Sequence, residues 1–178
     1  MSFPPVDPST TAIRPSSKGF VLGPDDGDGY WWLGSTTLIK LGASATDSDL
    51  DIVDHRVPAG YAPPPHVHRG QDEVFYIVDG DFAVRCGDDH WQAGPGSLVF
   101  LPKLVPHGFT VSDAGPGRTL LINAPAGFAD LIVELGTATT SLELPGPDVA
   151  MPDPDRITSE SESHGIFAPD RASWPPAC

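Results

Sequence analysis

Short apolar runs, separated by glycine, proline and polar residues, fill the chain between residues 33 and 125. Runs of this length that are rich in Val, Ile, Phe and Thr are typical of β-strands. The pattern predicts strands over residues 35–41, 50–57, 72–78, 81–86, 97–101, 107–111 and 119–123. Asp79-Gly80, between two of these runs, is a hairpin-turn signal because Gly accepts a positive φ at little cost. Regular short strands with such punctuation favour an all-β sandwich or barrel.

The character of the sequence changes after Pro125. Residues 127–135 form an amphipathic pattern that predicts a short helix. Residues 153–164 have proline near the start, an acidic first turn and a following glycine, which predicts a second helix. We therefore divide the chain into an N-terminal arm (1–19), a barrel (20–140) and a C-terminal helical and Pro-rich extension that packs on the barrel (141–178).

Composition narrows the classes of function. The 178 residues are enough for one domain with a real core, and the charged fraction of 19% does not suggest disorder. The net charge of −14 argues against nucleic acid and against an anionic membrane surface, since both require clustered Lys and Arg. No signal peptide or membrane-spanning run is visible, and two widely separated cysteines do not make a disulfide framework. The default expectation is a reduced, cytoplasmic protein.

Four residues of the metal-binding type stand at an informative spacing. His66 and His68 are two apart, so on an extended chain both imidazoles leave the same face. Glu73 opens the next strand, and strand parity selects it over Asp72 as the inward carboxylate. His107 enters a later strand after a proline-bounded turn. Three imidazoles and one carboxylate suit one divalent first-row metal, whether Fe, Ni, Mn, Co or Zn, and the sequence does not choose among them.

These stretches resemble the two motifs of the cupin superfamily. The first motif matches at every fixed position, which are Gly60, His66, His68, Glu73 and Gly80. The second matches at Gly96, Pro102 and His107 but departs at Leu104, where the family has Gly, and at Val111, where it has Asn. The resemblance implies a double-stranded β-helix (jelly-roll) barrel with short peripheral C-terminal helices, usually homodimeric, with one metal ion inside.

A looser likeness extends over most of the chain to the bacterial monocupins grouped as quercetin 2,3-dioxygenase-like proteins. It rests on short sequences near Gly23-Pro24, Trp32-Leu33-Gly34, 72–76, 106–109, 123–128 and His164-Gly165. This resemblance implies a metal-dependent dioxygenase that acts on a flavonol-like or other enolic aromatic substrate with O₂.

Other residues receive more modest interpretations. Phe75, Phe109 and Val111 share the inferred ligand face, and together with Trp32 they are candidate substrate-binding residues. The remaining histidines fit no ligand spacing and are expected on the surface or in turns; they are His55, His90 and His164.

Three hypotheses for function remain open. In the first, Glu73 is catalytic: it holds the metal and accepts the substrate hydroxyl proton in a dioxygenase reaction. In the second, the same ligands serve a redox-neutral cyclase, isomerase, lyase or decarboxylase, with the metal as Lewis acid. In the third, the protein is a non-catalytic small-molecule binder. The expected partners are an aromatic small molecule, O₂ and a second copy of the chain, with no nucleic acid and no membrane.

Overall fold

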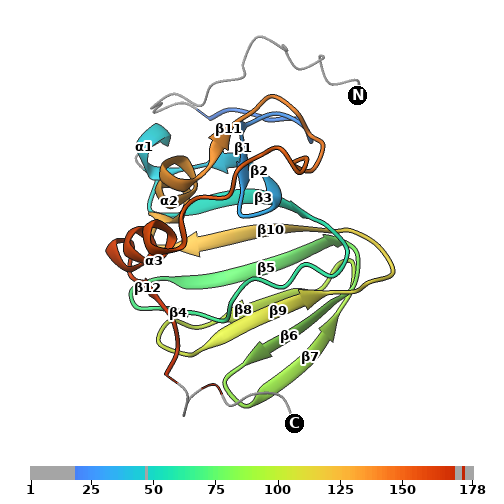
Figure 1. Ribbon diagram of the computed structural model, residues 1–178, viewed down its shortest axis with the longest axis vertical. Helices are drawn as coiled ribbons and strands as arrows, with labels where there is room; N and C mark the ends of the chain where they lie inside the picture. Colours follow the sequence, from blue (N-terminus) through green and yellow to red (C-terminus); the bar gives the residue numbers. More distant parts are fainter. Residues whose placement is uncertain (1–18, 47, 171–173, 175–178) are drawn as a thin grey trace.

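Two antiparallel sheets face each other and form the body of the protein (Figure 1). They are seen in a computed structural model that describes residues 19–46, 48–170 and 174. The larger sheet has the strand order β11-β1-β2-β3-β10-β5-β8, the smaller β7-β6-β9, and β12 pairs with β4 in a third ladder. The strands are β1 (Asp28–Trp32), β2 (Ser35–Leu41), β3 (Asp51–Val57), β4 (Val67–His68), β5 (Asp72–Asp79), β6 (Phe82–Cys86), β7 (Asp89–Ala93), β8 (Leu98–Leu101), β9 (His107–Val111), β10 (Gly117–Ala124), β11 (Thr137–Ala138) and β12 (Ile166–Phe167). The helices are α1 (Ala43–Thr46), α2 (Phe128–Leu135) and α3 (Pro154–Ser163).

The strands predicted from the apolar runs all appear, with ends that differ by a few residues. The structure adds the short helix α1 and five strands that the pattern did not predict, namely β1, β4, β7, β11 and β12. The all-β jelly-roll architecture is confirmed. The predicted N-terminal arm lies almost wholly outside the described residues.

The expected hairpin at Asp79-Gly80 is wrong. Strand β5 pairs with β10 and β8, whereas β6 pairs with β7 and β9, so the turn carries the chain from one sheet to the other. Gly80 does have the positive φ that the turn signal implied, at 83°. A Cβ at Gly80 would lie 2.6 Å from the Pro116 carbonyl oxygen, so close approach of a neighbouring loop also requires glycine here.

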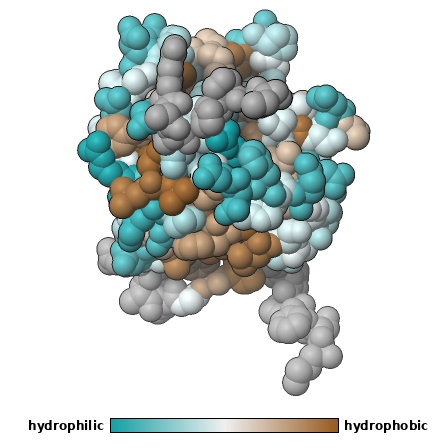
Figure 2. Space-filling view, turned by 90° about the horizontal axis from the view of Figure 1, so that it is seen from below, coloured by the Kyte–Doolittle hydropathy of each residue, from teal (hydrophilic) through white to brown (hydrophobic). Residues whose placement is uncertain are grey.

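Alternation along the strands places the core between the sheets. In β5 the side chains of Glu73, Phe75 and Ile77 are buried, while Tyr76 and Val78 point to the outside. Strand β9 contributes His107, Phe109 and Val111 from the facing sheet. The outer surface is not uniformly polar, and hydrophobic side chains gather in patches on the face seen from below (Figure 2).

Helix α2 covers one end of the space between the sheets. Its apolar face buries five side chains, which are Phe128, Ala129, Leu131, Ile132 and Leu135. The helix begins against the buried Asp51 of β3, whose Oδ2 accepts hydrogen bonds from the backbone N–H groups of Gly127 (2.7 Å) and Ala129 (3.0 Å). A carboxylate from the sheet therefore takes the place of a local N-cap and fixes the helix to β3.

Helix α3 and strand β12 bring the C-terminal part of the chain beside β4 (Figure 1). Helix α3 forms where the sequence pattern predicts it, with Asp153 as its N-cap, and it buries none of its own residues. It is linked to α2 by Arg156, which donates to the Glu134 carbonyl (2.6 Å), and by the His164–Glu134 pair (3.0 Å). No helix within the described ranges is long and apolar enough to cross a membrane.

Candidate metal centre

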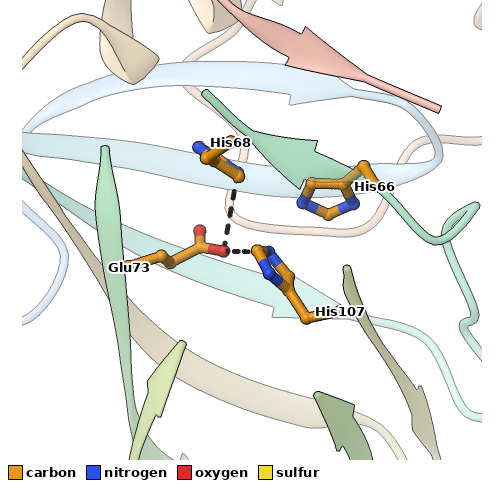
Figure 3. Close-up of side chains that lie close together, drawn as sticks. All are labelled: His66, His68, Glu73 and His107. Carbon is orange, nitrogen blue, oxygen red and sulfur yellow. Dashed lines mark ion pairs between the residues drawn. The ribbon is translucent and has the colours of Figure 1, made fainter. Parts of the chain in front are cut away.

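The four candidate ligands converge on one point between the two sheets. His66 immediately precedes β4, and His68, Glu73 and His107 belong to β4, β5 and β9. One ligand atom from each residue lies within 4.8 Å of the others, and Figure 3 shows the four side chains pointing toward one another. The sequence spacing therefore predicted this cluster correctly.

Backbone pairing fixes the positions of the three histidines. His66 and His107 exchange two N–H···O hydrogen bonds of 3.0 Å each, so these residues lie directly opposite one another. His68 pairs with Ile166 of β12 on the other side of β4. The short strand β4 is thus held between β9 and the C-terminal part of the chain.

Each histidine has a ring nitrogen fixed by an oxygen that cannot donate. The Nδ1 atoms of His66 and His107 lie 3.1 Å and 3.0 Å from the carbonyl oxygens of Pro64 and Val105. The Nδ1 of His68 lies 3.2 Å from Oε1 of Gln71. Because these partners are acceptors, Nδ1 carries the proton in all three rings and Nε2 presents a lone pair.

Gln71 is itself oriented by the fold. Its Nε2 donates to the Pro125 carbonyl at 3.0 Å, which leaves Oε1 facing His68. Hydrogen bonds of this kind behind a ligand histidine set the tautomer and the direction of the ring.

The free atoms of the cluster fit a metal ion. Asn123 donates to Oε1 of Glu73 at 3.3 Å, and Oε2 lies 3.3 Å from Nε2 of His107 and 3.7 Å from Nε2 of His68. These two Nε2 atoms and Oε2 are buried and have no hydrogen-bond partner in the described residues. Lone pairs that face a carboxylate without a proton between them are unfavourable unless a cation lies among them. The donor set suits a divalent first-row metal and does not select one.

The protonation states agree with this interpretation. Burial, together with the neighbouring His107, lowers the pKa of His66 to about 4, and burial also lowers the pKa of His68. Burial alone would raise the pKa of Glu73, but the facing His107 and the other nearby histidines lower it to about 2. At neutral pH His66 and His68 are therefore neutral and Glu73 is ionised, which are the forms that bind metal.

A cavity of about 240 Å³ reaches the cluster from one side. His66, which is half-buried, and Glu73 line it, whereas His68 and His107 are fully buried and are absent from its lining. Most other lining residues are apolar, among them Pro63–Pro65, Leu121, Phe128 and Leu131, and α3 contributes Ile157, Thr158, Ser161 and Glu162. The cavity therefore gives the cluster an approach that is lined mostly by apolar side chains.

Comparison with known proteins agrees with the geometry. Residues 53–123 match the family model of the cupin domain. The fold is that of a cupin jelly-roll barrel. A search of curated protein sequences finds no match. An RmlC-like cupin from Shewanella frigidimarina is 22% identical over 62% of this chain and 93% of its own, with a TM-score of 0.50.

Two further solved structures share the cupin fold at similar distance. Oxalate decarboxylase from Bacillus subtilis is 20% identical over 61% of this chain and 31% of its own, with a TM-score of 0.51. The protein PAC13 from Streptomyces is 16% identical over 62% of this chain and 84% of its own, with a TM-score of 0.50. At these identities the similarity concerns the fold.

Three of the four candidate substrate residues line the cavity of the cupin domain. They are Trp32, Phe75 and Phe109. The fourth, Val111, is 1% exposed and packs in the core, outside the lining of the cavity. A larger hollow of about 590 Å³ lies over the smaller sheet near Arg85 and Trp91, and it contains none of the four cluster residues.

The prediction for His55 is wrong. His55 is 2% exposed and lines the cavity, and its ring packs edge-on against Trp32 and Tyr61. His90 is exposed in β7, as expected, and His164 lies at the end of α3, where it pairs with Glu134. The parity of β3 could have located His55, because it shares a face with Val53 and Val57, which are fully buried. The charged neighbours on either side concealed this signal.

The departures from the second cupin motif have clear structural outcomes. Leu104 adopts a φ of 66°, so the backbone keeps the left-handed conformation that suits the glycine of the motif. Its backbone N–H donates to the His68 carbonyl at 2.8 Å, which links the loop before His107 to β4. At the second departure, Val111 fills the core. Neither change removes a ligand.

Proposed function

We propose that the protein is a metal-dependent enzyme that binds a small enolic or phenolic aromatic molecule beside His66 and Glu73. The observation that supports this proposal is the apolar, aromatic-lined cavity that reaches the cluster at His66 and Glu73. Such a cavity holds a ring by its faces and leaves an oxygen donor of the ligand to meet the polar end. A divalent metal bound by the four ligands would act there as a Lewis acid and lower the pKa of a coordinated hydroxyl.

Glu73 has two tasks in this proposal. Its Oε1 is held by Asn123, so the carboxylate has one fixed orientation, while Oε2 faces the histidines. The low pKa of Glu73, to which His107 and the other histidines contribute, keeps it ionised as a ligand. The same carboxylate lines the cavity and is the acidic group placed to take the proton of an incoming hydroxyl.

The leading reaction is a dioxygenation. Both atoms of O₂ would enter an enolic substrate, with C–C cleavage and release of carbon monoxide, as the resemblance to quercetin 2,3-dioxygenase-like monocupins implies. The cavity volume of about 240 Å³ lies below the roughly 300 Å³ at which pockets for drug-sized ligands begin. This favours a substrate of one or two rings over a three-ring flavonol.

Oxygen uptake tests this proposal directly. The protein is purified from cultures supplemented with each metal in turn, its metal content is measured, and O₂ consumption is followed with 3-hydroxychromone and with quercetin. We expect turnover with carbon monoxide release that disappears in Glu73→Ala. The matched control is Asp72→Asn, which changes the neighbouring outward carboxylate and should retain activity, since Oδ1 can still accept from the Lys103 N–H.

Each other outcome has a defined meaning. Metal-loaded protein that consumes no O₂ with either compound overturns the dioxygenase proposal. Anaerobic turnover of an enolic substrate would assign the site to a redox-neutral cyclase, isomerase, lyase or decarboxylase. Tight binding without turnover under any condition would assign it to a small-molecule binder.

A further inference from the structure

Two buried polar atoms on the wall of the cavity have no hydrogen-bond partner among the described residues. They are Nδ1 of His55 and Nε1 of Trp32. Both side chains line the cavity, and their rings meet edge-on with centroids 6.0 Å apart. Buried polar atoms are almost always paired in native proteins, so two unpaired atoms on neighbouring rings require an explanation.

The surroundings of His55 decide which nitrogen carries its proton. Oγ of Ser35 lies 2.5 Å from the Trp32 carbonyl oxygen, and two oxygens approach this closely only with the hydroxyl proton between them. Ser35 therefore has no proton left to give to His55. Nε2 of His55, at 2.9 Å from Oγ, must be the donor, and Nδ1 bears an unpaired lone pair.

His55 is a neutral hydrogen-bond acceptor in this arrangement. Burial lowers the pKa of His55 to about 4, although Glu73 and Asp54 act in the opposite direction. A ring with this pKa stays neutral at pH 7, so Nδ1 keeps its lone pair and can accept a hydrogen bond. The hydroxyl of Tyr61, on the same wall, is already used in a hydrogen bond of 3.2 Å to the Leu33 carbonyl.

The wall thus has one free acceptor, Nδ1 of His55, and one free donor, the indole N–H of Trp32, which can only donate. A hydroxyl group is the simplest substituent that satisfies both, because it gives one hydrogen bond and accepts another. We propose that His55 and Trp32 hold a hydroxyl of the substrate at a second polar point, separate from the cluster at His66 and Glu73. The substrate is then a small aromatic molecule with two oxygen substituents, one for each point. This inference rests on the proposed function only in taking the cavity as the substrate site.

A binding experiment without turnover tests the inference. Zinc-loaded full-length protein is titrated by calorimetry with 2-naphthol and with the 2,3-, 2,6- and 2,7-dihydroxynaphthalenes. We expect at least one diol to bind about tenfold more tightly than 2-naphthol, the gain from one added hydrogen-bonding group. His55→Phe should abolish this gain, so that the diol binds no more tightly than 2-naphthol to this variant. Trp32→Phe, which removes the N–H and keeps an aromatic ring, should reduce the same gain.

The control variant is Tyr61→Phe, which removes a hydroxyl of the same wall that is already paired, and it should keep the preference for the diol. Metal content and melting temperature establish that each variant is folded and loaded. His55→Phe leaves Ser35 bonded to the Trp32 carbonyl, so it creates no new unpaired group there.

The outcomes separate this inference from the proposed function. If 2-naphthol itself fails to bind, the cavity is not an aromatic site and both proposals fall. If 2-naphthol binds but no diol gains, or if the gain survives His55→Phe, only the role of His55 and Trp32 is overturned. Equal weakening of 2-naphthol and the diol by His55→Phe would show a purely structural role and would likewise overturn it.

Discussion

The two ends of the cavity use histidine in opposite ways. At the cluster, backbone and amide oxygens engage Nδ1 of His66, His68 and His107, and Nε2 is left free. At the far wall, Ser35 engages Nε2 of His55, and Nδ1 is left free. At the first end three lone pairs converge with a carboxylate, and at the second a single lone pair stands beside an indole N–H. The difference teaches that the hydrogen-bond partner of one ring nitrogen, and not burial alone, decides which nitrogen of a buried histidine presents a free lone pair.

The largest effect is expected on removing a cluster imidazole. His107→Ala should weaken zinc binding roughly 100- to 1,000-fold, since four ligands share about 10–16 kcal/mol in tight zinc sites. His55→Phe, at the other end of the cavity, should bind zinc as the wild type does. Competition titration against a chromophoric chelator measures both. Equal zinc affinity of His107→Ala and wild type would contradict the assignment of metal binding to the cluster end of the cavity.

Acid should destabilise the metal-free protein because buried groups at both ends of the cavity titrate with lowered pKa values. Burial lowers the pKa of His55 and of His66 from 6.5 to about 4, so the unfolded chain binds more protons between these values. Stability is therefore complete above about pH 6.5 and is lost as the pH falls toward 4. For His55 alone the loss is on the order of 3 kcal/mol. The lowered pKa of Glu73, held down by His107 and the other histidines, extends the loss toward pH 2.

Urea unfolding of apoprotein at a series of pH values measures this loss. His55→Phe should flatten the profile between pH 6.5 and 4, and His90→Phe, which replaces an exposed histidine, should leave it unchanged. A wild-type profile that is flat over this window would contradict the burial of uncharged histidines.

Gln71→Met should weaken zinc binding about 10- to 100-fold without removing a ligand. The thioether cannot reproduce the amide that accepts from Nδ1 of His68 and donates to the Pro125 carbonyl, so the ring loses its fixed tautomer. The same chelator competition gives the affinity, with Gln92→Met on the exposed strand β7 as the matched control. An unchanged affinity in Gln71→Met would mean that backbone pairing alone orients His68.

The smallest effect is expected at Leu104. Leu104→Gly should raise the free energy of unfolding by at most about 1 kcal/mol, because relief of the left-handed φ is partly offset by the greater freedom of glycine in the unfolded chain. The side chain is 65% exposed, so little burial is lost. Urea unfolding gives the value, and zinc affinity should not change. Destabilisation by Leu104→Gly would show that the contacts of the leucine side chain stabilise the fold by more than its left-handed φ costs.

The sequence predicted the cluster end better than the far wall for a physical reason. Ligands on one or two strands have a fixed spacing, so His66, His68 and Glu73 were identifiable from the sequence. His107 was identifiable because a proline-bounded turn leads into its strand.

Strand partners are set by packing over long sequence separations. The turn at Asp79-Gly80 was therefore recognised while its two strands were assigned to one hairpin. The two-residue strands β4 and β12 carry no periodicity to detect, and they exist because distant segments pair. The free nitrogen of His55 depends on Ser35, which lies on another strand, and no local pattern encodes that contact.

Helix α3 contributes to the lining of the cavity but not to the hydrophobic core. Four of its side chains line the cavity, yet the helix buries none of its residues and is linked to α2 through Glu134. Substitutions on its cavity side therefore change the lining of the cavity without creating voids in the core or displacing strands β4, β5 and β9. Under the proposed function, the cavity side of α3 can therefore diverge toward new substrates while the four-residue cluster and its strands stay constant. A library confined to Ile157, Thr158, Ser161 and Glu162 is accordingly the economical route to a changed substrate range.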